Sequence, residues 1–206
     1  VAPDRALRLY YRDNLELLAD CGAEILEFSP LADPALPAGC NALYVGGGYP
    51  EVFAGELAAN RPLRDAIRAA CHGGLPTFAE CGGLMYLCAS LRTEGKDWPM
   101  AGVFNCSTEM TGRLQRFGYA EIEYAGATSR CHEFHRSRVV PQAGTDGHGN
   151  SGPDYQFRYS LRKPETGKEW QCGLQRERSL AGYAHLHWYS SAPFTAKLME
   201  HFCETM

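Results

Sequence analysis

One short segment combines the residue types that nucleophilic catalysis needs. The apolar run of residues 75–79 leads through Glu80 into Cys81, and two glycines and an apolar helical stretch follow. A cysteine on a tight turn from strand to helix has the arrangement of a nucleophile elbow. A helix N-terminus lowers the pKa of a thiol, and the Gly82 amide is placed to face a developing oxyanion. The segment predicts a reactive Cys81, and the alternative is a buried structural cysteine.

A second glycine-rich segment follows another short apolar run. Residues 41–45 predict a strand, and Gly46, Gly47 and Gly48 come directly after it. Strands of a parallel sheet present their carboxyl ends at one edge, where such folds build their sites. Amides of Gly47 and Gly48 are therefore candidates for a second oxyanion donor. A phosphate loop is disfavoured because no Lys-Ser or Lys-Thr follows, and a structural turn is the other alternative.

A cysteine nucleophile also needs a base, and the chain has seven histidines. His185 and His187 alternate with Leu186 in a late apolar segment, which predicts that both lie on one face of a strand. They could pair as metal ligands, but no third ligand lies in register. His132 and His135 are three residues apart, so they do not form H-E-x-x-H. No metal site is predicted, and either histidine pair could be purely structural.

The elements that would position these residues alternate in the first half of the chain. Helical spacing predicts helices around residues 11–18, 62–70 and 84–91, and apolar runs predict strands at residues 23–28, 41–45 and 75–79. This alternation predicts a parallel sheet covered by helices on both sides.

The second half is rich in expected strands. Strands are predicted at residues 103–124, 155–161 and 181–189, with a loop at 142–153 and a closing helix that contains Phe194, Leu198 and Phe202. Because no repeat, charge block or linker interrupts the chain, residues 1–206 are expected to form one domain.

Composition narrows the class of protein. Of the 206 residues 45% are hydrophobic and 21% charged, and the formal charge is −4, which argues against non-specific nucleic-acid binding. No apolar run is long enough to span a membrane. Nine cysteines without a C-x-x-C pair favour buried thiols in a reducing environment. A soluble, cytoplasmic protein is expected.

Taken together, the motifs resemble a known family. The segments GGGYPE, AECGGLMYL, HEFH and GYAHLH, in this order and after an opening YYRDNL, resemble the glutamine amidotransferase domain of cobyrinic and hydrogenobyrinic acid a,c-diamide synthases. The resemblance covers nearly the whole chain. It implies an α/β fold of the flavodoxin-like class I glutamine amidotransferases. The sheet would be mostly parallel with helices on both faces and additional antiparallel strands in the second half.

The resemblance also implies partners. In the family, an N-terminal synthetase domain uses ATP and Mg²⁺ to activate the a and c carboxylates of a corrin. The glutaminase domain hydrolyses glutamine and supplies ammonia for their amidation in cobalamin biosynthesis. This chain matches only the glutaminase half and contains no G-x-x-x-x-G-K-[ST] segment. Val1 is therefore expected to be a cut end within the first strand, with no cofactor bound by this domain.

Residue roles carry over by motif. Cys81 matches the nucleophile and His185 the general base, while Gly47, Gly48 and Gly82 match the oxyanion and glutamine site. Triad enzymes of this class place a glutamate two residues after the histidine, but His187 stands there. A Cys-His dyad is expected, with an unassigned orienting or accessory group among Glu80, Glu133, His132, His135 and His187.

Two alternatives stay open on the sequence. The chain could be the glutaminase of another synthetase, such as a cobyric acid synthase or a cell-wall amidating complex. It could instead be a flavodoxin-like cysteine sensor or binding module without amidotransfer. The order of Cys81 and then His185, after a glycine loop, favours hydrolysis.

Overall fold

The computed structural model describes residues 1–142 and 153–203. The helices are α1 (Arg12–Asp20), α2 (Ala54–Ala59), α3 (Arg61–His72), α4 (Gly82–Leu87), the short 3₁₀ helix η1 (Trp188–Ser190) and α5 (Ala192–Cys203). The strands are β1 (Leu43–Val45), β2 (Thr77–Glu80), β3 (Cys88–Thr93), β4 (Lys96–Pro99), β5 (Phe104–Met110), β6 (Arg116–Tyr124), β7 (Ala127–His135), β8 (Ser137–Pro141), β9 (Gln156–Arg162), β10 (Glu169–Arg176) and β11 (Ser179–Gly182).

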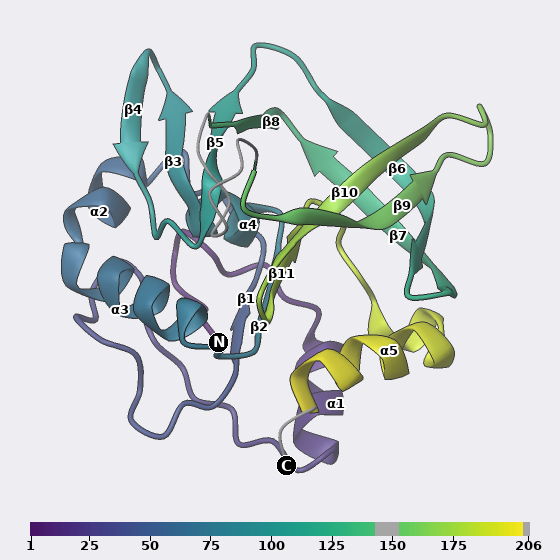
Figure 1. Ribbon diagram of the computed structural model, residues 1–206, viewed down its shortest axis with the longest axis horizontal. Coiled ribbons are helices and arrows are strands. Elements are labelled where there is room, and N and C mark those ends of the chain that lie inside the picture. Colours follow the sequence, from purple (N-terminus) through teal and green to yellow (C-terminus); the bar gives the residue numbers. More distant parts are fainter. Residues whose placement is uncertain (143–152, 204–206) are drawn as a thin grey trace.

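The largest sheet has seven strands in the order β1-β2-β11-β10-β9-β6-β7. Its first three strands are parallel, with Ala79 of β2 opposite Val45 of β1 and Ala181 of β11. These three short strands are buried along their whole length because helices cover both sides. Figure 1 shows α2 and α3 on one side of them and α1 and α5 on the other. The expected α/β architecture is confirmed.

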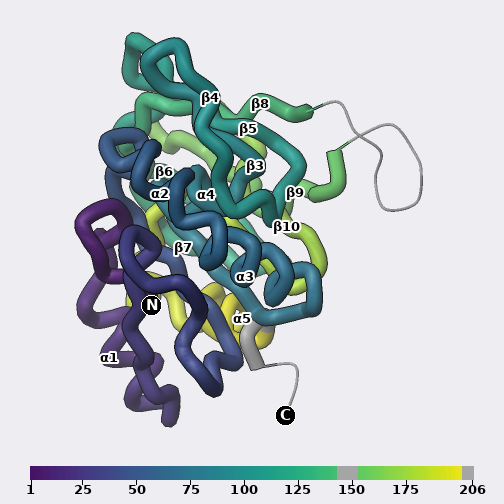
Figure 2. Tube along the Cα trace, turned by 90° about the vertical axis from the view of Figure 1, so that its left-hand side faces the viewer, coloured from purple at the N-terminus to yellow at the C-terminus, as the bar shows by residue number. Residues whose placement is uncertain are grey.

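Antiparallel strands make up a larger part of the fold than expected. From β11 onward the large sheet is antiparallel, and it curls until an isolated antiparallel bridge joins His132 of β7 to His185, just beyond β11. A second sheet, β4-β3-β5-β8, combines one parallel pair with two antiparallel pairs. It lies at the opposite end of the molecule from α1 and α5 (Figures 1 and 2).

Three sequence predictions need correction. Residues 23–28 form no strand: the main chain of Leu26 and Phe28 bonds only to Val1, and a single residue cannot build a ladder. The helix expected over residues 84–91 ends at Leu87, and Cys88 begins β3. Because every residue of α4 is buried, apolar spacing there could not separate helix from strand.

The third correction concerns the segment that carries His185. The strand expected over residues 181–189 ends at Gly182, and η1 begins at Trp188. The Asn14 side chain of α1 explains this, because its Nδ2 donates to Leu186 O at 2.7 Å and its Oδ1 accepts from Trp188 N at 2.9 Å. These main-chain groups therefore have a side-chain partner instead of a neighbouring strand.

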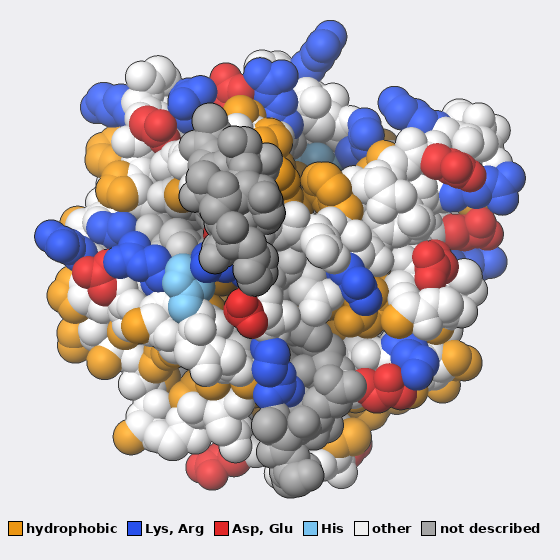
Figure 3. Space-filling view, viewed as in Figure 1, with side chains coloured by type: hydrophobic (Ala, Val, Ile, Leu, Met, Phe, Trp, Pro, Cys, Tyr) orange, Lys and Arg blue, Asp and Glu red, His pale blue; other side chains and the backbone are white. Residues whose placement is uncertain are grey.

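Other expectations agree with the structure or fall outside it. The helices around residues 11–18 and 62–70 and the closing helix are confirmed as α1, α3 and α5. Most of the loop predicted at 142–153 lies outside the described residues. The described helices include none long and apolar enough to cross a membrane. Basic and acidic side chains are interspersed on the face shown in Figure 3.

Candidate active site

Cys81 lies at the turn from β2 into α4, as the sequence predicts. Its φ of 49° is a left-handed backbone conformation that non-glycine residues rarely adopt, and such strain is often found at functional sites. The Cys81 N–H donates to Gly182 O at 2.7 Å, which ties the turn to the end of β11. The thiol is therefore held at the carboxyl edge of the three parallel strands.

The thiol is not acidic in this structure. Burial raises the pKa of Cys81 to about 12, and the carboxylates of Glu51, Glu80 and Glu133 act in the same direction. A hydrogen bond from the Gly82 amide opposes this rise but does not outweigh it. The expectation that the helix N-terminus lowers the thiol pKa is therefore wrong, because desolvation dominates over a helix of only six residues. Reaction requires a base to remove the proton during attack.

The glycine loop after β1 packs directly on this turn. A Cβ on Gly82 would lie 2.8 Å from Gly48 N, so the two residues touch through their main chains. Within the described chain the Gly48 N–H has no hydrogen-bond acceptor. The main chains of Gly48 and Gly82 therefore lie against each other next to the Cys81 turn, and both amides are candidates for stabilising an oxyanion. Gly47, which precedes Gly48 in the loop, faces the His185 ring, and a Cβ added to Gly47 would lie 2.6 Å from Cε1 of His185.

His185 lies three residues beyond β11, the strand next to β2. Its ring stacks on His132 with centroids 4.8 Å apart and an angle of 13° between planes. Burial, together with a smaller effect of the imidazoles of His132 and His135, lowers the pKa of His185 to about 4. The ring is therefore neutral near pH 7 and able to accept a proton. In the described residues no hydrogen bond joins His185 to Cys81, although both lie at the same sheet edge.

Glu80 is fully buried and both of its oxygens have partners. Oε1 accepts from Leu186 N at 2.9 Å, and Oε2 accepts from the Tyr44 hydroxyl at 2.9 Å. Burial raises the pKa of Glu80 to about 7, against the effect of these two hydrogen bonds. Glu80 therefore anchors the main chain next to His185 and does not bind the imidazole.

The remaining candidates for an orienting group point elsewhere. His187 places Nε2 3.0 Å from Asp13 Oδ2 on α1. His135 places Nδ1 2.8 Å from Ser137 O and stacks on Tyr183, with its pKa lowered to about 4 by burial.

Glu133 is buried on the same side of β7 as His135. Burial raises the pKa of Glu133 to about 7, and its Oε2 has no hydrogen-bond partner among the described residues. Of the accessory candidates, the structure brings only His132 into contact with His185.

Sequence reasoning missed two residues at the start of α1. The Tyr11 hydroxyl lies 3.2 Å from Nδ1 of His132, and Asn14 holds the segment that follows His185. Both belong to the opening YYRDNL segment, which the sequence marks only through the family resemblance. A fully buried asparagine on a short helix is the kind of signal that becomes visible only with the structure.

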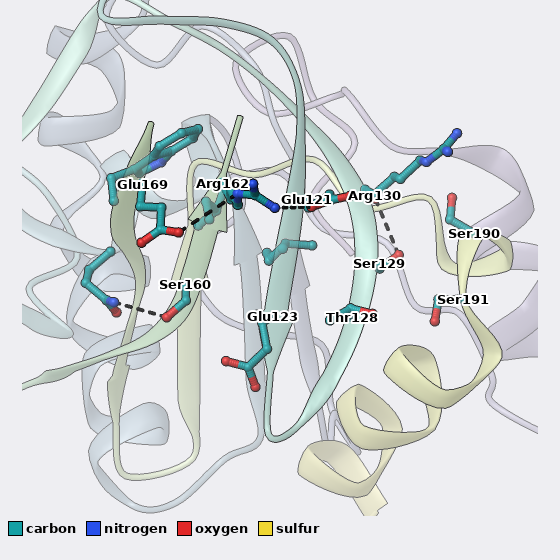
Figure 4. Close-up of a pocket in the computed structure, with 14 residues that line it drawn as sticks. Glu121, Glu123, Thr128, Ser129, Arg130, Ser160, Arg162, Glu169, Ser190 and Ser191 are labelled. Carbon is teal, nitrogen blue, oxygen red and sulfur yellow. Dashed lines mark hydrogen bonds and ion pairs between the residues drawn. The ribbon is translucent and has the colours of Figure 1, made fainter. Parts of the chain in front are cut away.

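A groove with a volume of about 750 Å³ is separate from this site. It is lined by residues of β6, β7, β9 and β10 and by Ser190 and Ser191 (Figure 4). Arg162 inside it lies near the carboxylates of Glu121 and Glu169, at 3.9 and 4.0 Å. Neither Cys81 nor His185 lines the groove. Across the described ranges, no three His, Cys, Asp or Glu side chains group as metal ligands.

Comparison with known proteins places the chain among amidotransferases. A sequence model of the CobB/CobQ-like glutamine amidotransferase domain matches residues 1–193. Cobyrinate a,c-diamide synthases from Caldanaerobacter subterraneus and Listeria innocua are 38% and 42% identical over 198 residues, 92% of this chain. The corresponding protein of Clostridium tetani is 38% identical over 97% of the chain. The chain spans only 41–45% of the length of these three relatives.

Solved structures agree on the fold. A glutamine amidotransferase structure superposes with a TM-score of 0.62 at 20% identity, covering 94% of this chain and 92% of that one. A Thermotoga maritima glutamine amidotransferase gives 0.55 at 11% identity, with 93% and 76% covered. These likenesses establish the flavodoxin-like amidotransferase fold, and the sequence match establishes the family. The chain belongs to the CobB/CobQ-like glutamine amidotransferase family.

Proposed function

We propose that this chain hydrolyses glutamine through a thioester on Cys81. The observation that carries the proposal is the strained Cys81 turn packed against the glycine loop, which brings the main chains of Gly48 and Gly82 together at this turn. The carboxamide carbon of glutamine is the electrophile, and its oxygen becomes the oxyanion that Gly48 and Gly82 stabilise. One such donor typically contributes about 3 kcal/mol to lowering the barrier.

The proton inventory of the site fits this chemistry. Neutral His185 takes the thiol proton as sulfur attacks the carbonyl carbon, and it returns that proton to the departing ammonia. His185 next removes a proton from water, the water oxygen attacks the thioester, and glutamate leaves as the proton returns to sulfur. A protonated thiol with a neutral imidazole is the starting state that the pKa values of Cys81 and His185 describe.

We further propose that the ammonia serves a corrin a,c-diamide synthase. The relatives with this name extend well beyond the matched region, and an ATP- and Mg²⁺-dependent synthetase portion that binds the corrin would be the natural partner of this domain. This chain would contribute the glutaminase domain alone. A sensor role is disfavoured, because an oxidant-sensing cysteine needs an accessible thiolate, whereas the Cys81 thiol is buried with a raised pKa.

The decisive experiment is intact-mass analysis after incubation with 6-diazo-5-oxo-norleucine, a glutamine analogue. We expect one adduct on the wild type, mapped to Cys81, and none on Cys81→Ser. Cys21→Ser, which removes an exposed thiol, should label like the wild type. The assay is run on this chain and on the full-length protein that contains it. Absence of a Cys81 adduct in both would overturn the proposal.

A further inference from the structure

The His185 ring has an aromatic neighbour, the imidazole of His132. The two rings lie nearly parallel, and the two residues also exchange main-chain hydrogen bonds. His185 N donates to His132 O at 2.9 Å, and His132 N donates to His185 O at 3.3 Å. Main chain and ring are therefore fixed by the same residue, which restrains both the position and the tilt of the imidazole.

His132 is itself held in place from two sides. Its Nδ1 lies 3.2 Å from the Tyr11 hydroxyl at the start of α1. Its main chain belongs to β7, where it faces Tyr119 of β6 in the longest strand pairing of the molecule. A ring attached to a long strand pair and bonded through one nitrogen has little freedom to turn. His132 therefore provides a rigid surface for the second imidazole.

The His185 ring also meets the glycine loop. Cε1 of His185 occupies the space that a Cβ on Gly47 would fill, so the loop allows close approach but leaves little room to move. In the part of the chain that the structure describes, no carboxylate hydrogen-bonds to the His185 ring. Glu80 is engaged with Leu186 and Tyr44, and Asp13 with His187.

We propose that His132, held by Tyr11, is the positioning residue for His185 and takes over by ring stacking the orienting role of the missing triad carboxylate. The inference rests on the proposed role of His185 as the base. Stacking fixes the imidazole plane without placing a negative charge next to it. Burial is the main cause of the lowered pKa of His185, and the imidazoles of His132 and His135 add to it when they are protonated. The arrangement therefore keeps His185 neutral and ready to accept the thiol proton.

The test compares two substitutions of His132 in the full-length protein. His132→Phe keeps an aromatic ring for stacking, and His132→Ala removes it. We expect His132→Ala to lower kcat for glutamine hydrolysis by about 10- to 100-fold, the order of effect expected from a displaced catalytic group, with KM changed less than about threefold. His132→Phe loses the hydrogen bond to Tyr11 but keeps a ring on β7, so its kcat should lie closer to that of the wild type than to that of His132→Ala. His72→Ala, a histidine outside the site, is the matched control.

Two further readouts separate positioning from a merely structural role. Loss of the neighbouring imidazole raises the pKa of His185, so the acid limb of kcat/KM should move to higher pH in His132→Phe. In NMR spectra the His185 ring proton, assigned with His185→Gln, should keep its ring-current shift in His132→Phe and lose it in His132→Ala.

The outcomes decide between the possibilities. Full activity in His132→Ala would overturn the inference. So would a His132→Phe variant that is as slow as His132→Ala while its thermal stability matches the wild type, because the ring nitrogen would then be the essential feature. If the wild type fails to react with glutamine, the proposed function fails, while the NMR comparison still decides whether His132 orients His185.

Discussion

The contact between Gly47 and His185 makes a residue-scale prediction. In Gly47→Ala the new Cβ would lie 2.6 Å from Cε1 of His185, so the ring must shift. Because a side chain can move aside more easily than main chain, we expect the variant to fold. The displaced His185 should lower kcat for glutamine hydrolysis by at least about 10-fold. Steady-state kinetics with circular dichroism as a folding check would measure this.

Gly48→Ala provides the contrast within the same loop. There the new Cβ would lie 2.0 Å from the main-chain oxygen of Ala6, and main chain cannot move aside cheaply. This variant should lose stability as well as activity. A Gly47→Ala enzyme with wild-type kcat would contradict the view that the position of His185 limits the rate.

The sequence predicted the parts of the site that depend on local geometry, but not those that depend on the whole fold. The Cys81 turn was predictable because a short apolar strand, a cysteine and two glycines are adjacent in sequence, so local geometry suffices. The contact between His132 and His185 was not, because it joins residues brought together only when the large sheet curls. The thiol pKa was mispredicted because burial is a property of the whole fold.

At the scale of elements, the α1 helix positions the segment that carries His185. Asn14 donates to Leu186 O and accepts from Trp188 N, both in buried surroundings. Asn14→Ala leaves both groups without a partner, so the free energy of unfolding should fall by about 2 kcal/mol or more. Urea denaturation would measure the change, with a loss of glutaminase activity expected in parallel.

Two variants sharpen this comparison. Asn14→Asp keeps an acceptor for Trp188 N but places a buried carboxylate oxygen against Leu186 O, so at neutral pH it should be no more stable than Asn14→Ala. Asn41→Ala, at an exposed asparagine, should stay within about 0.5 kcal/mol of the wild type. Equal stability of Asn14→Ala and Asn41→Ala would show that α1 does not hold the segment.

The elements most easily predicted were those with a local signal. Helix α3 has Pro62 in its first turn, an amphipathic pattern and glycines at its end, and it forms as expected. The apolar pattern of residues 84–91 continues across the boundary at Cys88, where pairing with β5 replaces the helix. The end of β11 likewise depends on Asn14, far away in sequence. Tertiary partners decide such boundaries.

At the scale of the whole molecule, the curling of the seven-stranded sheet brings β7, at one of its edges, back to the segment that follows β11. The parallel strands β1 and β2 carry the glycine loop and Cys81 at one edge, as the alternation in the first half predicts, and β11 of the second half pairs with β2 at this edge. The antiparallel strands return β7 to that edge and bring His132 to His185. The second half of the chain therefore completes the site that the first half begins.

Four buried ionisable groups have shifted pKa values, and two of them make stability depend on pH in the opposite direction from the other two. The pKa values of His135 and His185 are lowered to about 4, so between pH 4 and 6.5 the unfolded chain binds more protons there and acidification destabilises the fold. The pKa values of Glu80 and Glu133 are raised to about 7, so between pH 4.5 and 7 the folded chain binds more protons and acidification stabilises it. The two pairs oppose each other between pH 4.5 and 6.5.

Single substitutions should expose this balance with opposite signs. Relative to the wild type, Glu80→Gln removes a group that stabilises the fold on acidification, so its free energy of unfolding should fall more as pH drops from 6.5 to 4.5. His135→Gln removes a destabilising group, so its stability should fall less over the same range. Urea denaturation at several pH values gives the slope of unfolding free energy against pH for each protein. Each variant's slope should differ from that of the wild type by up to about 1.4 kcal/mol per pH unit, the value for one net proton. Parallel slopes in all three proteins would contradict this prediction, because they would show that Glu80 and His135 titrate alike in the folded and unfolded chains.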